Sequence, residues 1–193
     1  MKKLSDILME LKDYSLITYE HSIRVANICM MFGRRLGLTD EEVKTLKMAG
    51  LLHDIGKLKI PKEILDKPSK LTKEEYEKIK MHPRYGVDLL MRNGFNDTEV
   101  LNSIMFHHER IDGLGYPYGL DGNNIPKLAQ ILVVCDCFDA MNSKRPYHEA
   151  EGINYIRNEF INNSGTQFSS YYAKEMLLFL DSIVKEREMR RKK

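Results

Sequence analysis

The sequence predicts a mainly helical protein that folds as one domain, or as one domain with a small appendage. Of its 193 residues, 42% are hydrophobic and 30% are charged, which is ordinary for a globular chain with a single core. Leu, Ile, Met, Lys and Glu dominate, while Gly and Pro are sparse outside a few short loops. Apolar residues recur at spacings of three and four, which is the period of a helix with one buried face.

Helix-period patterns and end signals predict the elements in chain order. They place helices at residues 4–11, 18–36, 39–54, 72–80, 85–92, 97–108, 125–142, 149–162 and 170–185. The first is a short amphipathic arm that we expect to begin at Ser5. Gly37 ends the second helix, and Asn93 with Gly94 ends the fifth. The helix over 125–142 is the most apolar, so we expect it at the centre of the fold.

Two local patterns determine further boundaries. Residues 39–42 and 72–75 both read Thr-x-x-Glu, the spacing of a capping box, in which each side chain accepts a hydrogen bond from the other residue's backbone N–H. His82 precedes Pro83, and a residue before proline is biased away from the helical region. We therefore expect His82 at a junction between two helices.

Charge and composition give no reason to expect nucleic acid or a membrane as a partner. The formal net charge is only +2, and the basic excess is concentrated in residues 186–193, which we expect to be a solvated helix end. The sequence contains neither a long apolar run nor a secretory signal. Its three cysteines lack Cys-x-x-Cys spacing, so we expect reduced thiols in a cytoplasmic protein.

Residues 51–57, Leu-Leu-His-Asp-Ile-Gly-Lys, carry the strongest chemical signal. His53 and Asp54 end an apolar helical run, and imidazole and carboxylate are ligand types that suit Fe, Mn, Zn or Ni. A carboxylate also has two oxygens with which to bridge two ions. Lys57 is close enough in sequence to reach an anion held at the same ions. A His-Asp pair arises often by chance, so this stretch alone does not decide between a metal site and none.

The distribution of histidines favours the metal site. Five of the six lie within or at the end of apolar helical segments, at helix-length intervals: His21, His53, His82, His107 and His108. Ligands that converge from several helices on one point require such spacing. Taken alone, His21 could equally be a core histidine bonded to a carbonyl, and His82 could be a helix cap.

Two later segments add candidates. Asp136 lies in the most apolar helix, where an ionised carboxylate is costly unless it is paired or binds a cation. Cys135 and Cys137 flank it on other faces, and we expect both to be small core residues. Residues 110–117, Arg-Ile-Asp-Gly-Leu-Gly-Tyr-Pro, form a tight loop that is either a simple turn or the wall of a pocket. The basic residues 144–145 either bind a phosphate or complement a helix C-terminus.

In this order, these residues resemble the HD-GYP subgroup of the HD metal-dependent phosphohydrolases. The pattern extends over residues 14–180 and combines His21, residues 53–57, His82-Pro83, residues 107–117, Asp136 and residues 145–147. The resemblance implies an all-α HD-domain helical bundle with a metal centre between helices. This catalytic domain would occupy residues 17–185, with a short helix over 1–16 packed on it and a basic tail over 186–193.

The resemblance also implies an activity and its cofactors. It predicts hydrolysis of cyclic di-GMP, a bacterial second messenger, to linear pGpG, to GMP or to both. Two divalent ions are expected, Fe or Mn first, with Ni, Zn or Mg as alternatives. A hydroxide that bridges these ions would attack the phosphorus atom.

A role for each matching residue follows from the resemblance. The expected metal ligands are His21, His53, Asp54, His82, His107, His108 and Asp136. His21, His53 and Asp136 would hold one ion and the other three histidines the second, with Asp54 as the bridge. Asp54 and Lys57 are the expected catalytic residues. The expected substrate-binding residues are Lys57, Arg110, Asp112, Gly115, Tyr116, Pro117 and Arg145.

The sequence departs from the family pattern in three places. Ile17 stands where some members have a glutamate that binds a third metal, so we expect two ions. Ile111 stands where tryptophan is common, and residues 168–170 read Phe-Ser-Ser instead of Phe-Asp-Pro. Neither of these two changes removes an expected ligand, but both could alter the base pocket or the local packing.

Alternative functions stay open at the level of sequence. The chain could hydrolyse another nucleotide or cyclic dinucleotide, or it could be a weakly active module that binds a nucleotide or a partner protein. Family members are usually fused to sensor or receiver domains, and none is recognisable in this sequence. Regulation would then come from expression, from oligomerisation such as a homodimer, or from a partner signalling protein.

Overall fold

The computed structural model describes residues 1–143 and 151–191. In chain order its helices are α1 (Leu4–Tyr14), α2 (Leu16–Arg35), α3 (Asp40–Leu52), the 3-10 helix η1 (Ile55–Lys59), α4 (Lys62–Leu65), α5 (Lys73–Lys80), α6 (His82–Arg92), α7 (Thr98–Phe106), α8 (Lys127–Asn142), α9 (Ile153–Asn162) and α10 (Ser170–Arg191). Within the described ranges, the extended pairing consists of isolated β-bridges that join Asp112 to Asp121 and Ser164 to Phe168. The predicted all-α fold class is confirmed.

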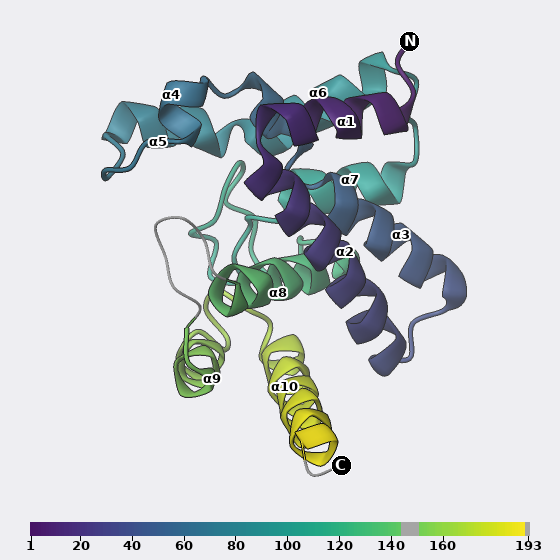
Figure 1. The fold of residues 1–193 in the computed structure, drawn as a ribbon, viewed down its shortest axis with the longest axis vertical. Coiled ribbons are helices and arrows are strands. Elements are labelled where there is room, and N and C mark those ends of the chain that lie inside the picture. The colour runs from purple at the N-terminus through teal and green to yellow at the C-terminus, as the bar shows by residue number, and fades with distance from the viewer. Residues whose placement is uncertain (144–150, 192–193) are drawn as a thin grey trace.

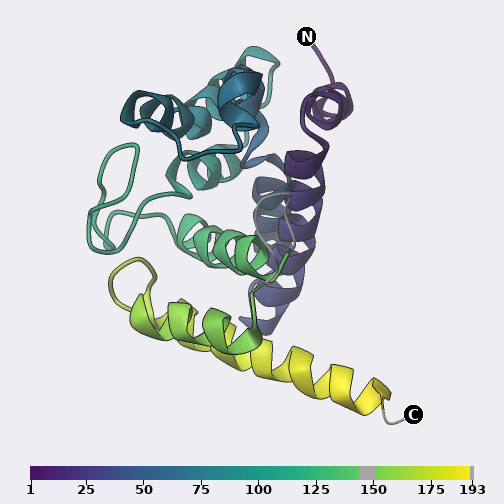
Figure 2. The same cartoon turned by 60° about the vertical axis from the view of Figure 1, so that its left-hand side comes forward.

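Helix α8 lies at the centre of the fold, as its apolar sequence predicts. It packs against α2, α3 and α7, and α9 and α10 cover another side of it (Figure 1). Figure 2 shows α8 between α2 and the pair formed by α9 and α10. The largest fully buried side chains of these central helices include Phe32, Leu46, Leu52, Ile104, Ile131 and Leu132. A helix that is apolar on all sides must be surrounded by others, and α8 meets this requirement.

Both predicted capping boxes are present. The backbone N–H of Thr39 donates to Glu42 Oε2 at 2.8 Å, and the N–H of Glu42 donates to Thr39 Oγ1 at 3.2 Å. The same pair of bonds joins Thr72 and Glu75, at 2.7 and 3.2 Å. These boxes begin α3 and α5, the first of which ends directly before His53.

Neither Ser5 nor residue 18 begins its helix, because hydrogen bonds that the sequence pattern did not single out form earlier in the chain. The Asp6 carboxylate accepts a hydrogen bond from the backbone N–H of Lys3 at 3.2 Å, so α1 begins at Leu4 rather than at Ser5. Ser15 Oγ accepts one from the N–H of Thr18 at 3.3 Å, and α2 begins at Leu16 rather than at residue 18. The predicted division of the chain after residue 16 stays a prediction.

Other predicted boundaries also shift. Helix α6 begins at His82 rather than at residue 85, because Pro83 is in the first turn, where a helix does not need its N–H. The expectation of a junction at His82 is confirmed, since only Met81 separates α5 from α6. Helix α10 continues to Arg191, beyond the predicted end at residue 185. The predicted start of α9 at residue 149 lies outside the described residues.

Among the described helices, none combines the length and the hydrophobicity that crossing a bilayer would require.

A close backbone contact between η1 and α6 positions the beginning of α6. A Cβ atom added at Gly56 would lie 1.9 Å from the carbonyl O of His82 and 2.4 Å from the backbone N of Gly86. Such contacts are impossible without moving one backbone from the other. Gly56 is therefore required so that the segment after Asp54 can lie against the helix that begins with His82.

We expect Gly56→Ala to lower the free energy of unfolding by about 3 kcal/mol, because the methyl group would force η1 away from α6. Urea denaturation of the metal-free protein measures this change. Gly152→Ala is the matched control, since a Cβ there meets no atom within 4 Å. We expect the control to change the free energy by less than about 1 kcal/mol. Equal effects of the two substitutions would contradict the packing argument.

Candidate metal centre

Helix ends bring most of the predicted ligands to one point. His53 follows the last residue of α3, His82 is the first residue of α6, and His107 follows the last residue of α7. His21 and Asp136 reach the same point from the interiors of α2 and α8. Ligand atoms that lie within 4.8 Å of one another form three overlapping groups: His21 with His53 and Asp54, His53 with His107 and Asp136, and His82 with His107 and His108.

The Asp54 carboxylate lies between the histidines of the two sides. Its Oδ2 atom is 3.8 Å from His21 Nε2 and 3.4 Å from His53 Nε2. Its Oδ1 atom is 3.3 Å from His82 Nε2. The two oxygens therefore face different groups of nitrogen atoms, which is the arrangement that a bridging carboxylate needs. Lys57 Nζ lies 2.7 Å from Oδ2 and adds a positive charge at the edge of the cluster.

Asp136 completes the side that contains His21. Its Oδ1 atom lies 2.9 Å from His21 Nε2 and 3.7 Å from His53 Nε2. Cys135, before it, is fully buried in the core as predicted. Cys137, after it, packs against the core but is only partly buried and lines a cavity beside His108, so the prediction that it is a core residue is confirmed only in part.

Hydrogen bonds at the outer ring nitrogens turn the Nε2 atoms inward. The Nδ1 atoms of His53, His82 and His107 lie 2.8, 2.8 and 2.6 Å from the carbonyl oxygens of Gly50, Ile79 and Ile104, respectively. Because a carbonyl only accepts, each Nδ1 must carry the hydrogen, and each Nε2 then presents a lone pair. His108 is oriented by its ring, which stacks on Tyr116 at a centroid distance of 4.6 Å and an interplanar angle of 26°.

The inward-facing nitrogens fit a cation. His53 Nε2 is buried and has no hydrogen-bond partner within the described part of the chain. His82 Nε2 and His107 Nε2 are 3.2 Å apart, and their tautomers direct two lone pairs at each other. A buried acceptor without a donor is costly, and two facing acceptors repel. A cation would satisfy all three nitrogens, so the donor set suits divalent transition metals.

Burial and nearby charge set the protonation states of this cluster. Burial lowers the pKa of His82 to about 3 and that of His108 to about 4, and it holds the pKa of His107 well below its usual value. Burial also opposes protonation of His21, but its hydrogen bonds to the carboxylates of Asp136 and Asp139 outweigh this effect and raise its pKa to about 9.

The two carboxyl groups are ionised despite their burial. Burial would raise the pKa of Asp54, but Lys57 and then His53 hold that pKa well below its usual value. A hydrogen bond from His21 does the same for the pKa of Asp136. Neutral His82, His107 and His108 beside ionised carboxylates are ready to bind a divalent cation, whereas His21 must lose its proton when a cation binds.

The loop that follows the two adjacent histidines is held by its own side chains. Glu109 is buried, and its carboxylate accepts hydrogen bonds from the backbone N–H groups of Tyr118 and Leu120 at 2.7 and 2.9 Å. A Cβ at Gly115 would lie 2.4 Å from the backbone N of Arg110. Gly115 therefore lets the loop fold back on itself.

Arg110 and Asp112, both expected to bind substrate, pair with each other in the structure. Arg110 Nη2 lies 2.6 Å from Asp112 Oδ2, and Arg110 Nη1 donates to Gln167 Oε1 at 3.3 Å. The backbone N–H of Asp112 donates to the carbonyl O of Thr166 at 2.9 Å. These contacts join the loop to the segment between α9 and α10.

A cavity of about 520 Å³ lies beside this loop and reaches the metal cluster at His108. Its lining includes Tyr76, His108, Arg110, Tyr116, Cys137 and Gln167. Gln167 Nε2 donates to Cys137 Sγ at 3.4 Å, so a hydrogen bond also joins these two residues of the cavity wall. Pro117, joined to Tyr116 by a cis peptide bond, does not line this cavity. Arg145 lies outside the described residues, and its predicted role stays a prediction.

Sequence reasoning missed four contributors around the site. Glu109 and Gln167 shape the loop. Asp139 contacts the outer side of His21, and Arg24 donates a hydrogen bond to Asp139. The spacing of three residues between Asp136 and Asp139 is a signal that could have been used, because it places both on one side of a helix. Ile17, which stands at the position of the third-metal ligand in some family members, is 44% exposed on α2.

Comparison with known proteins is consistent with this geometry. The sequence pattern of the HD domain family matches residues 6–160. The chain is 43% identical over 140 residues to the cyclic di-GMP phosphodiesterase PA4108 of Pseudomonas aeruginosa, a match that covers 72% of this chain and 34% of that protein. It is 40% identical over 147 residues to the 3′3′-cGAMP-specific phosphodiesterase 1 of Vibrio cholerae. This match covers 75% of this chain and 33% of that protein.

Solved structures share the fold. Bd1817, an HDG"Y"P protein from Bdellovibrio bacteriovorus, superposes with a TM-score of 0.70 at 21% identity, over 88% of this chain and 53% of the other. The chain spans about a third of the length of the two phosphodiesterases. The helical fold, the histidine and aspartate cluster and these similarities together show that the chain belongs to the HD domain family and to its HD-GYP subgroup.

Proposed function

We propose that the chain hydrolyses a phosphodiester bond of cyclic di-GMP and releases linear pGpG, GMP or both. The observation that carries this proposal is the convergence of five imidazoles and two carboxylates on one point, with the Nε2 lone pairs of His53, His82 and His107 directed inward. The similarity to proteins named as cyclic dinucleotide phosphodiesterases supports the substrate class.

The proposed centre holds two divalent ions. His21, His53 and Asp136 would bind one, and His82, His107 and His108 the other, with Asp54 shared. Fe or Mn is the proposed metal, with Ni, Zn or Mg as alternatives, since mixed imidazole and carboxylate sets suit several of these ions. When bound, such a pair of ions supplies an activated water and neutralises charge on the phosphate.

Residues of the chain itself would prepare the phosphate for attack. Asp54 and Lys57 are the proposed catalytic residues. Lys57 is partly exposed, with 22% of its side chain accessible, and its ammonium group lies at the edge of the cluster beside Asp54. A cation in this position can approach a non-bridging phosphate oxygen and stabilise the charge that develops there.

The cavity of about 520 Å³ beside His108 is the proposed site for part of the nucleotide. Tyr76 and Tyr116 offer aromatic rings to a base or sugar, and Gln167 offers an amide. Arg110 and Asp112 form an ion pair with each other. We therefore propose that they support substrate binding indirectly, by holding in place the loop that contains Gly115, Tyr116 and Pro117.

Hydrolysis of a hybrid cyclic dinucleotide is the second candidate. The Vibrio cholerae relative named for 3′3′-cGAMP is nearly as similar to this chain as the Pseudomonas aeruginosa protein named for cyclic di-GMP. An inert binding module is less well supported, because every expected metal ligand is present. A cytoplasmic location and a homodimer or signalling partner stay predictions from the sequence.

The first test is direct. We expect anaerobically purified protein to contain about two ions per chain and to convert cyclic di-GMP to pGpG or GMP, as measured by elemental analysis and chromatography of the products. Parallel reactions with 3′3′-cGAMP and cyclic di-AMP compare kcat/KM. A higher kcat/KM for 3′3′-cGAMP would favour the second candidate, and bound metal without turnover of any cyclic dinucleotide would contradict the proposal.

Removal of the shared carboxylate should abolish activity. We expect Asp54→Ala to reduce kcat/KM at least about a hundredfold. Removing a side chain that only supports a metal ligand typically costs about 10- to 100-fold in activity, and removing the ligand itself should cost more. Asp88→Ala, on the exposed face of α6, is the matched control and should leave kcat/KM unchanged. Unaltered hydrolysis by metal-replete Asp54→Ala would rule out the shared-ligand role.

The metal-free protein should be most stable near pH 6.5. The pKa values of His82 and His108, about 3 and 4, lie below 6.5, so unfolding binds protons and stability falls as the pH decreases below 6.5. The pKa of His21, about 9, lies above 6.5, so its stabilising contribution is complete below pH 6.5 and is lost as the pH rises through 9. Urea titrations of chelator-treated protein at pH 5, 6.5 and 9 measure this dependence. Greater stability at pH 5 than at pH 6.5 would contradict the buried neutral histidines.

A further inference from the structure

His21 is held differently from the other histidines that surround the cluster. His53, His82 and His107 stand at helix ends, where carbonyl groups lack partners within the helix, and each Nδ1 faces the carbonyl oxygen three residues earlier. His21 lies inside α2, where such carbonyls already accept helix hydrogen bonds. Its Nδ1 instead faces Asp139 Oδ2 at 2.7 Å, a carboxylate from α8.

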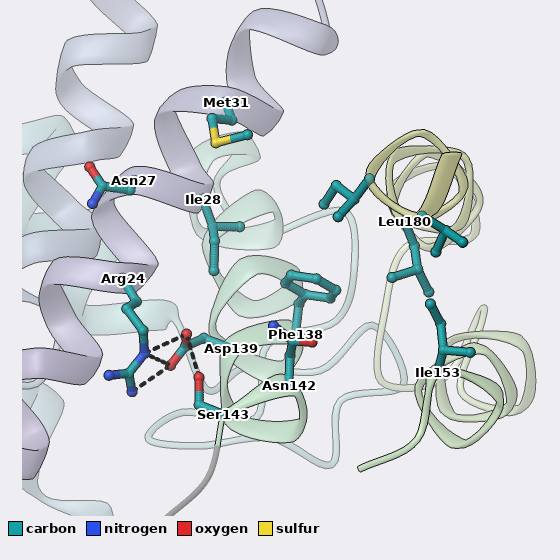
Figure 3. Close-up of a pocket in the computed structure, with 12 residues that line it drawn as sticks. Arg24, Asn27, Ile28, Met31, Phe138, Asp139, Asn142, Ser143, Ile153 and Leu180 are labelled. Atoms are coloured by element: carbon teal, nitrogen blue, oxygen red, sulfur yellow. Dashed lines mark hydrogen bonds and ion pairs between the residues drawn. The ribbon is translucent and has the colours of Figure 1, made fainter. Parts of the chain in front are cut away.

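The Asp139 carboxylate is itself fixed from two sides. Arg24 Nε donates to Oδ1 at 2.9 Å, and Arg24 Nη2 donates to Oδ2 at 3.1 Å. Ser143 Oγ donates to Oδ1 at 2.9 Å. Figure 3 shows the guanidinium, the carboxylate and the hydroxyl in this arrangement. Asp139 is only 1% exposed, so these contacts, together with His21, satisfy a buried charge.

We propose that Asp139, fixed by Arg24 and Ser143, is the positioning residue that holds His21 with Nε2 toward the metal centre, so that its removal weakens one of the two metal positions selectively. This inference rests on the proposed metal centre. An ionised carboxylate accepts the Nδ1 hydrogen, so the proton that His21 loses when a cation binds is the one on Nε2, which then directs its lone pair at the cation. It also makes the imidazole a stronger donor than a backbone carbonyl would.

Selectivity follows from how the second group is held. His82 and His107 are oriented by backbone carbonyls, and His108 by stacking on Tyr116. These contacts involve α5, α7 and the loop after α7, and they do not depend on Asp139. Loss of Asp139 should therefore release the ring of His21 and leave the second group of three histidines in place.

The structure also allows the contact to be tested without destroying the fold. Arg24, Asp139 and Ser143 line one end of a cavity of about 400 Å³ whose other walls include Phe138 and Leu180 (Figure 3). The Arg24 side chain is 38% exposed, so a shorter neutral side chain there remains hydrated. Within the described residues, the ion pair of Arg35 on the same helix is a long contact to Glu175, at 4.0 Å, so Arg35 serves as the matched position.

The experiment measures Mn²⁺ binding by the purified full chain, made metal-free and then titrated under anaerobic conditions. We expect Asp139→Ala to lower the affinity for one of the two ions about 10- to 100-fold and to leave the affinity for the other unchanged. Asp139→Asn keeps an acceptor oxygen and should restore part of this affinity. Arg24→Gln should lower the affinity for the same ion to a smaller extent, whereas Arg35→Gln should leave that affinity unchanged.

The outcomes separate this inference from the proposed function. A wild-type chain that binds fewer than two ions would overturn the two-ion centre itself. A wild-type chain with two ions whose affinities are unchanged in both Asp139→Ala and Arg24→Gln would overturn only the positioning role. Equal weakening of both ions would also overturn it, because a general loss of structure does not select one position. If Asp139→Ala fails to fold, Arg24→Gln and Asp139→Asn decide by the same criteria.

Discussion

The burial of two carboxylates and five imidazoles at one point is the constraint on which the rest of the structure depends. Asp54, His53 and His107 are each at most 1% exposed, so each polar atom must find a partner or a cation inside the bundle. Helices α3 and α7 meet this demand by ending at the cluster and α6 by beginning there, whereas α2 and α8 pass it. An ending helix contributes free carbonyl groups as well as a ligand, and these carbonyls fix the tautomers of the histidines.

This constraint also explains the glycine at the centre of the strongest motif. After Asp54 the chain must turn immediately and lie against α6, because α6 begins with the next ligand, His82. Only a residue without a Cβ allows the backbone of η1 to approach that of α6 so closely. The short approach between η1 and α6, which Gly56 allows, is therefore what brings Asp54 and His82 to the same cluster.

Much of the fold and cluster could be predicted because the information is local. Caps at residues 39–42 and 72–75, the apolar run around Asp136 and the histidines at helix ends are all visible within one turn of sequence. The Asp139 contact could not be read in the same way, because its partner His21 is 118 positions away. The partial exposure of Cys137 could not be predicted for a related reason. Cys137 packs against the core, but it also lines a cavity whose other wall is a loop distant in sequence.

The region after α8 illustrates how a segment without metal ligands supports the site. Residues 168–170 depart from the family pattern, yet Phe168 is buried and packs on Phe160 at a centroid distance of 5.0 Å. This packing holds the segment between α9 and α10, from which Thr166 and Gln167 bond to the loop beside His108. The change to serine at residue 169 therefore leaves the aromatic anchor intact. The wall of the cavity depends on this anchor and on two hydrogen bonds, rather than on the residues that differ from the family pattern.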